Sequence, residues 1–179
     1  MTNNIKLQEV CKQLHIPVVG TTSWPLPREA REILRESNPC PFTAADLEER
    51  LIGTSEFMPR SAIVCLFPYH VPHENPTNLS RYTWATDYHL VVTDYLQRLV
   101  DELKTTAPDA SFSIHCDTSP LADRYIAYLA GLGFYGKNKC FISPTWGSYI
   151  VIGTVLTTLE FESNTPMTDT CMGCNQCIT

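Results

Sequence analysis

The segment DYHLVVTDYLQRLVDELK, residues 87–104, together with SFSIHC, residues 111–116, decides the fold class. Apolar residues recur every three or four positions in the first segment, which predicts an amphipathic helix with one buried face. Its apolar positions are Tyr88, Val92, Leu96, Leu99 and Leu103. In the second segment apolar residues alternate with Ser111, Ser113 and His115, which is typical of a strand with one face in water.

The flanking sequence repeats this alternation of helices and strands. Helical patterns cover residues 5–14 and 28–37, and another helix is expected from a Ser119-Pro120 cap to Gly131. Apolar runs predict strands at 61–67, 139–142 and 149–161. About five strands interleaved with about five helices predict an α/β domain with a mixed sheet flanked by helices. We expect this domain to cover residues 1–162, and residues 163–179 to be the start of a truncated, ferredoxin-like iron–sulfur segment, of which the cysteines are described below.

Composition limits the possible functions. The chain has 179 residues, of which 44% are hydrophobic, so it can bury a core. Thirteen Lys and Arg face 19 Asp and Glu, and this net charge of −6 lacks the basic excess needed to hold a nucleic-acid backbone unaided. No window approaches the roughly 18 to 20 apolar residues that cross a bilayer. The N-terminal residues resemble no secretion signal, so we expect a cytoplasmic protein without membrane contact.

Three of the eight cysteines, Cys171, Cys174 and Cys177, are spaced by two residues near the end of the chain. Thiolates at this spacing can wrap one face of a 4Fe–4S cluster. A zinc site with a further ligand, or a reactive tail, remains an alternative. The sequence stops at Thr179, before the cysteine and proline that usually continue the pattern, so this set of cluster ligands is incomplete.

Two further segments are candidates for binding a ligand. Asp117 follows the strand at 111–116, where α/β proteins gather ligand-binding residues. It is either an acid that favours the start of a helix or, beside an apolar cofactor, a proton donor. The glycines of residues 131–138 either end a helix or let the backbone approach a flat cofactor, to which Lys137 and Asn138 would offer donors.

Asp87 and His89 begin a pattern similar to the D-x-H-x-x-G signature, in which a histidine replaces the lower base of cobalamin. The position of the glycine is occupied by Val92. We therefore do not expect His89 to be a ligand of cobalt.

Taken together, these segments resemble the epoxyqueuosine reductases. The resemblance runs in order through residues 48–50, 59–64, 80–82, 87–89, 115–124, 131–138 and 147–160. It implies a nitroreductase- or reductive-dehalogenase-like domain that binds cobalamin, with 4Fe–4S clusters as the source of electrons. The implied reaction is the reductive deoxygenation of epoxyqueuosine in tRNA to queuosine.

The resemblance also implies roles for individual residues. Asp117 would be the proton donor, and Cys171, Cys174 and Cys177 would be the first three cluster ligands. The implied cobalamin contacts are Arg50, Ser80, Asp117, Arg124, Lys137 and Asn138. A departure at Ala85-Thr86, where the family carries a glycine and a basic residue, puts that corner of the pocket or the substrate in question.

The resemblance implies tRNA and an electron donor as partners, with tRNA contacted through residues beyond Thr179. The net negative charge of the chain agrees with a tRNA contact outside these residues. Because both clusters would also need residues beyond Thr179, the chain alone is expected to lack complete clusters. Two alternatives stay open: a non-catalytic corrinoid carrier or sensor, and an electron-transfer or metal-binding module.

Overall fold

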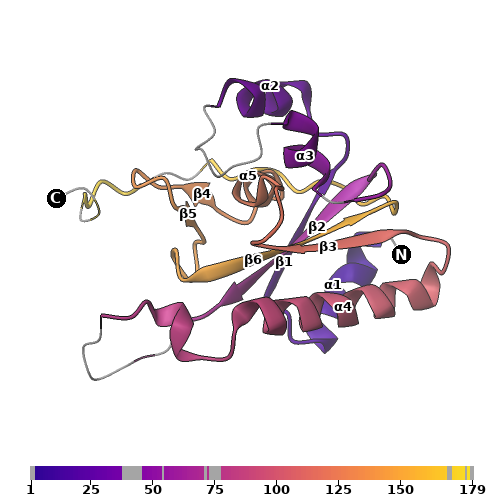
Figure 1. Ribbon diagram of the computed structural model, residues 1–179, viewed down its shortest axis with the longest axis horizontal. Helices are drawn as coiled ribbons and strands as arrows, with labels where there is room; N and C mark the ends of the chain where they lie inside the picture. Colours follow the sequence, from indigo (N-terminus) through magenta and orange to yellow (C-terminus); the bar gives the residue numbers. More distant parts are fainter. Residues whose placement is uncertain are drawn as a thin grey trace.

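The centre of the structure is a four-stranded sheet (Figure 1). This computed structural model describes residues 3–37, 46–53, 55–70, 72, 78–168, 171–175 and 177. The strand order is β1 (Val18–Ser23), β2 (Ser61–Pro68), β6 (Ile150–Thr157) and β3 (Phe112–Cys116), and each of the three pairings is antiparallel. Two short strands, β4 (Phe134–Tyr135) and β5 (Phe141–Ile142), pair separately.

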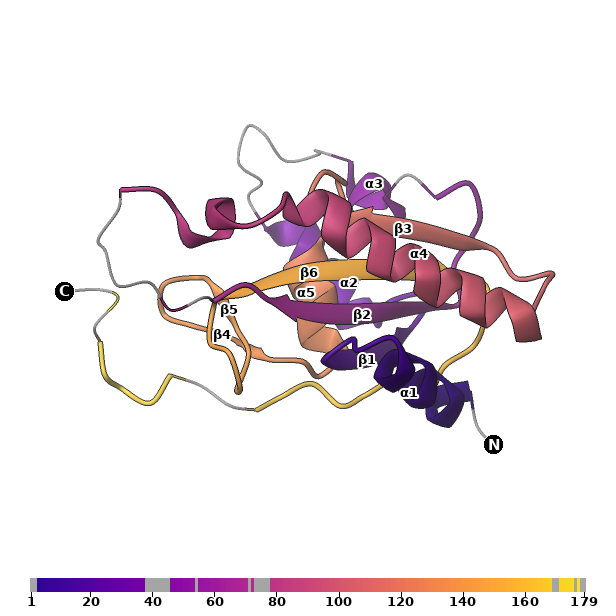
Figure 2. The same ribbon diagram turned by 90° about the horizontal axis from the view of Figure 1, so that it is seen from below.

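Helices cover both faces of the sheet (Figures 1 and 2). One face carries α1 (Asn3–Gln13) and α4 (Tyr88–Thr106), and the other carries α2 (Arg28–Glu36), α3 (Leu47–Ile52) and α5 (Asp123–Leu129). Alternate residues of β2 pack into the two cores, with Val64 on the α5 side and Ile63 on the α4 side. A strand buried on both faces explains the continuous apolar run. The expected α/β domain, with helices flanking its sheet, is confirmed, but the four-stranded sheet is antiparallel and not mixed.

The helix predicted over residues 87–104 is α4, and its apolar stripe faces the sheet. Val92 and Leu96 pack so closely on β6 that a Cβ atom at Gly153 would lie 2.8 Å from each of their side chains. Asp87 caps the helix, because its side chain accepts a hydrogen bond from the backbone N–H of His89. None of the helices in the described residues, α4 included, has both the length and the apolar character to cross a membrane.

The start predicted for the helix after β3 was wrong. The helix, α5, begins at Asp123, four residues after Ser119. The hydroxyl of Ser119 accepts a hydrogen bond from the backbone N–H of Leu121 at 3.1 Å and contacts Nδ1 of His115 at 2.9 Å. Ser119 thus closes a local turn instead of capping the helix. The predicted end is confirmed, since Gly131 follows the helix with a positive φ of 71°.

The water-exposed face predicted for β3 was wrong at His115, which is only 3% exposed. Its Nε2 lies 2.9 Å from the hydroxyl of Ser113, and its Nδ1 contacts Ser119. Burial lowers the pKa of His115 to about 4, so the imidazole is neutral near pH 7. This neutral ring holds the segment that follows Asp117 against the sheet.

The polar segment after β6 forms hydrogen bonds with β1 at the edge of the sheet. Thr21 of β1 donates its backbone N–H to Oδ1 of Asn164 at 2.7 Å, and its carbonyl accepts the backbone N–H of Asn164 at 2.8 Å. The Thr21 hydroxyl also donates to the carbonyl of Glu162 at 2.7 Å. These bonds cover the free edge of β1, which is one way in which proteins protect the edge of a sheet.

Candidate functional site

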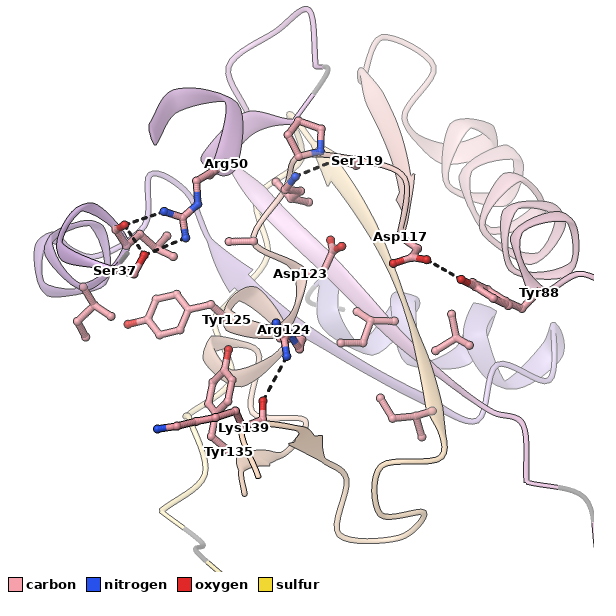
Figure 3. A pocket seen from close by; sticks show the side chains of 18 of the residues that line it. Ser37, Arg50, Tyr88, Asp117, Ser119, Asp123, Arg124, Tyr125, Tyr135 and Lys139 are labelled. Atoms are coloured by element: carbon pink, nitrogen blue, oxygen red, sulfur yellow. Dashed lines mark hydrogen bonds between the residues drawn. The ribbon is translucent and has the colours of Figure 1, made fainter. Parts of the chain in front are cut away.

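A cavity of about 1110 Å³ opens on the α5 side of the sheet (Figure 3). It is larger than the ~300–1,000 Å³ typical of sites for small molecules. Its charged lining residues are Arg50, Asp117, Asp123, Arg124 and Lys139. Its aromatic and aliphatic lining includes Tyr69, Tyr82, Tyr88, Tyr125, Tyr135, Ile150 and Ile152. The cavity therefore joins an extended apolar wall to a few charged groups.

Asp117 lies at the turn that follows β3, with its side chain directed into the cavity (Figure 3). Its φ of 56° lies in the left-handed region, which aspartate tolerates better than most residues. The carboxylate accepts a hydrogen bond from the hydroxyl of Tyr88 at 2.5 Å, and Nε2 of His89 lies 3.5 Å from the same oxygen. The first turn of α4 therefore holds the carboxylate that the sequence identified as the candidate acid.

Asp87, His89 and Asp117 form a continuous line of contacts. Nδ1 of His89 lies 2.8 Å from Oδ1 of Asp87, which fixes the ring with Nε2 toward Asp117. The hydrogen bond from the backbone N–H of His89 lowers the pKa of Asp87. Sequence reasoning excluded His89 as a cobalt ligand but missed this contact with Asp117, because the two residues are 28 positions apart in the sequence.

Asp123 and Arg124 enter the cavity from the first turn of α5. Oδ1 of Asp123 is buried and has no hydrogen-bond partner among the described residues. Burial and the neighbouring charge of Asp117 raise the pKa of Asp123 to about 7, while Arg124 acts in the opposite direction. Arg124 donates to the carbonyl of Lys139 at 3.2 Å. Sequence reasoning selected Arg124 and missed Asp123, which has the usual appearance of an acid in the first turn of a helix.

Arg50 lines the cavity but also supports the end of α2. Its guanidinium donates to the carbonyl of Leu34 at 2.8 Å and to the hydroxyl of Ser37 at 3.0 Å. Its own carbonyl accepts the backbone N–H of Ala122, just before α5. Two of the five guanidinium donors are thus used by other residues in the described part of the chain.

The other predicted cofactor contacts lie outside the described lining of the cavity. Ser80 directly precedes the 3₁₀ helix η1 (Arg81–Trp84), whose Tyr82 lines the cavity. Lys137 and Asn138 lie in the turn between β4 and β5, and Lys139, two residues after Lys137, faces the cavity instead. The roles of Ser80, Lys137 and Asn138 in binding a cofactor stay predictions.

The turn between β4 and β5 contacts the cysteine segment. The backbone N–H of Lys137 donates to Sγ of Cys171 at 3.2 Å, and Nζ of Lys137 donates to Oδ1 of Asn175 at 2.8 Å. Cys174 and Cys177 are exposed. In the part of the chain that is described, no group of three or more Cys, His, Asp or Glu is gathered around a common point as metal ligands would be. The metal-binding role of the cysteines stays a prediction.

Comparison with known structures first identifies the class of fold. A reductive dehalogenase, whose structure suggests a mechanism for B12-dependent dehalogenation, matches with a TM-score of 0.56 and 14% identity over 90% of this chain and 20% of that chain. At this identity the match concerns the fold alone. The chain therefore has the α/β fold that also occurs in a reductive dehalogenase.

The sequence comparisons identify a narrower group. The family model described as Epoxyqueuosine reductase QueG, DUF1730 matches residues 55–118. The epoxyqueuosine reductase of Bacillus cereus is 41% identical over 98 residues, which are 55% of this chain and 26% of the relative. That of Gloeobacter violaceus is 33% identical over 137 residues, which are 74% of this chain and 41% of the relative. The chain is thus similar in sequence to epoxyqueuosine reductases.

Solved structures agree with this relationship. Epoxyqueuosine reductase from Streptococcus thermophilus matches with a TM-score of 0.82 and 26% identity over 99% of this chain and 51% of that chain. An epoxyqueuosine reductase with an epoxyqueuosine-modified tRNA stem loop matches with a TM-score of 0.81 and 26% identity over 97% of this chain and 50% of that chain. The chain thus spans about half the length of these enzymes, and less than half of the two curated relatives.

Proposed function

We propose that this chain is the cobalamin-binding part of an epoxyqueuosine reductase-like enzyme, which deoxygenates epoxyqueuosine in tRNA to queuosine. The observation that carries the proposal is the large cavity into which Asp117 points from the turn after β3. The relationship to epoxyqueuosine reductases, over about half of their solved chains, supports it.

The lining of the cavity fits cobalamin. The ring of this cofactor is broad and flat and carries amide groups at its edge, so it requires a large apolar wall with polar groups around it. Tyr125, Tyr135 and Ile152 offer such a wall, and Arg50, Arg124 and Lys139 offer donors beside it. Ser80, Lys137 and Asn138 complete the proposed contacts. When bound, reduced cobalamin would supply the electrons for deoxygenation.

Asp117 is the proposed acid of the reaction. Removal of the epoxide oxygen requires a proton at that oxygen. Asp117 carries a carboxyl group that lines the cavity from the turn after β3 and could supply this proton. Tyr88 and His89 hold its side chain in place, because both contact Oδ2. The aromatic wall would exclude water from the reacting atoms.

Cys171, Cys174 and Cys177 are proposed ligands of a 4Fe–4S cluster, which requires a further ligand from elsewhere in the protein. An external electron donor would reduce it. The modified tRNA would be held mainly by other parts of the protein, since this chain carries a net charge of −6. The crystallised complex of a related enzyme with a tRNA stem loop supports tRNA as the partner. Such an enzyme would act in the cytoplasm.

A titration with cobalamin tests the proposed cofactor. We expect a saturable change of the visible spectrum to the base-off form, and at least tenfold weaker binding by Arg124→Ala. Arg98→Ala is the matched control, because this arginine lies on α4 and does not line the cavity. A spectrum that does not change in excess cobalamin, or equal weakening by both variants, would overturn the proposal.

A single-turnover reaction separates the enzyme from the alternative of a corrinoid carrier. The cobalamin-loaded protein is reduced chemically and mixed with an RNA stem loop that contains epoxyqueuosine. Formation of queuosine, measured by mass spectrometry of the nucleosides, is the result expected for a reductase. Tight cobalamin binding without this product would favour the carrier.

A further inference from the structure

The proposed reaction consumes two protons, whereas one carboxyl group carries only one. Conversion of an epoxide to an alkene breaks two C–O bonds, forms one C=C bond and releases the oxygen as water. This consumes two electrons, which a reduced iron–sulfur donor would provide through the cofactor, and two protons. Asp117 can deliver one proton before it must itself be reprotonated. The inference below rests on the proposed function and concerns the source of the second proton.

Two carboxyl groups face the same cavity (Figure 3). Asp117 lies in the turn after β3, and Asp123 is the first residue of α5. Their surroundings differ, because the Asp117 side chain is 63% exposed and accepts a hydrogen bond from Tyr88. Oδ1 of Asp123 is instead buried, and the described residues offer it no hydrogen-bond donor.

Such a buried oxygen is costly for an ionised carboxylate, which needs donors around it. It is much less costly for a carboxylic acid, which is neutral and can itself donate a hydrogen bond into the cavity. We propose that Asp123 is the second proton donor of the reaction and holds a proton ready in the cavity, so that Asp117 need not be reprotonated within the turnover.

The charges around Asp123 support this role. Burial has the largest effect and raises the pKa of Asp123 to about 7, and the negative charge of Asp117 acts in the same direction. Arg124, the next residue along α5, partly opposes both effects. Arg50 and Lys139 are the other cationic residues among the described lining of the cavity. A group with this pKa can both hold and release a proton near pH 7, which is the property required of a general acid.

The first test measures the protonation of Asp123 directly and needs no cofactor. The chain is labelled with ¹³C at the aspartate carboxyl groups and titrated by NMR, with the Asp123→Asn variant to assign the signal. We expect a midpoint near 7, a lower midpoint in Asp117→Asn, and a higher one in Arg124→Met. A midpoint in the ordinary range near 4 would overturn the proposal.

The second test follows the reaction. In the single-turnover assay we expect Asp123→Asn to form queuosine at least tenfold more slowly than the unchanged protein, while its cobalamin titration is unaltered. The rate of the unchanged protein should also fall as the pH rises above 7, and the residual rate of the variant should lose this dependence. Asp94→Asn, a change at an exposed carboxyl on α4, is the control and should behave like the unchanged protein.

The outcomes separate this inference from the proposed function. If the unchanged protein binds cobalamin and forms queuosine, but Asp123→Asn matches its rate and pH profile, only the role of Asp123 is overturned. If the unchanged protein forms no queuosine, the proposed function fails. The proton-donating role of Asp123 then fails with it, whatever its carboxyl midpoint.

Discussion

The hydroxyl of Tyr88 donates a 2.5 Å hydrogen bond to Oδ2 of Asp117 and so joins the first turn of α4 to the turn after β3. Helix α4 covers the face of the sheet opposite α5, and β3 is an edge strand of the sheet. The cavity opens on the α5 side. The bond therefore couples the candidate acid to a helix that contributes little else to the cavity.

Tyr88→Phe removes this bond while it keeps the ring. Because the Asp117 carboxylate is exposed, we expect the free energy of unfolding to fall by no more than about 1 kcal/mol. Hydrogen exchange at the backbone N–H of Thr118, which donates to the carbonyl of Cys116, should become several-fold faster. Tyr95→Phe is the control on the same helix, and equal exchange rates in both variants would contradict the prediction.

Arg50→Met tests whether Arg50 supports the fold as well as the cavity. It removes hydrogen bonds to Leu34 and Ser37, and we expect the free energy of unfolding in urea to fall by about 1–3 kcal/mol. Arg28→Met is the control, because Arg28 belongs to an exposed ion pair with Glu32 and should change stability by less than about 0.5 kcal/mol. Similar losses in both variants would refute a structural role for Arg50.

His115 gives stability a pH dependence. Its pKa falls from an ordinary 6.5 to about 4 on folding, so its neutral form is favoured in the folded protein. The contribution of His115 to the free energy of unfolding is complete above pH 6.5. It is lost as the pH falls toward 4, at up to about 1.4 kcal/mol per pH unit. Asp123, whose pKa is raised from 3.8 to about 7, acts in the opposite direction, since its contribution is lost as the pH rises through 7.

Comparison with His115→Gln isolates the histidine, because Asp123 titrates in both proteins. Urea unfolding between pH 4 and 7 should show that the advantage of the unchanged protein over the variant shrinks as the pH falls. A constant difference across this range would show that the imidazole titrates alike in the folded and unfolded chain.

Gly131 allows the segment after β6 to lie close to the end of α5. A Cβ atom at this position would lie 2.5 Å from the carbonyl oxygen of Thr165. Gly131→Ala should therefore displace the segment and speed hydrogen exchange at the backbone N–H of Asn164. Gly147→Ala is a matched control, because Gly147 also has a positive φ but has open space around its Cβ position. Unchanged protection of Asn164 in Gly131→Ala would contradict the close packing.

Lys137 should limit access to Cys171. Lys137→Met removes the hydrogen bond to Asn175, so we expect alkylation of Cys171 in the metal-free chain to become several-fold faster. Cys174, which is already exposed, is the internal reference, and Lys104→Met on α4 is the control variant. Equal acceleration at both cysteines would mean that the whole segment had detached, and no acceleration would mean that Lys137 does not hold it.

The parts of the fold that depend on local pattern could be predicted from the sequence. The periodicity of α4 and the apolar run of β2 located both elements, and each predicted end lies within two residues of the observed one. The burial of His115 could not be predicted, because alternation distinguishes the faces of a strand but not what covers each face. The start of α5 was missed because the Ser119 hydroxyl contacts His115, which lies on a different element.

Part of the candidate site could also be predicted from the sequence. Asp117 was selected because it follows a strand, and Arg50 and Arg124 were selected by resemblance to a family; all three line the cavity. Asp123 was missed, although it directly precedes Arg124, because its burial and its proximity to Asp117 depend on packing. Lys139 was missed because sequence reasoning selected its neighbours Lys137 and Asn138 in the same turn.

The position of β6 has a consequence for the nascent chain. Among the described residues β6 is the last strand in sequence, yet it lies between β2 and β3. While the ribosome is still adding residues 117–149, β1 and β2 can pair, but β3 has no neighbour with which to form the native sheet. The strand edges of β2 and β3 remain open to other chains until residue 157 has left the exit tunnel. We therefore expect this domain to complete its sheet only after residue 157 has been added, and truncation before residue 157 to yield aggregates.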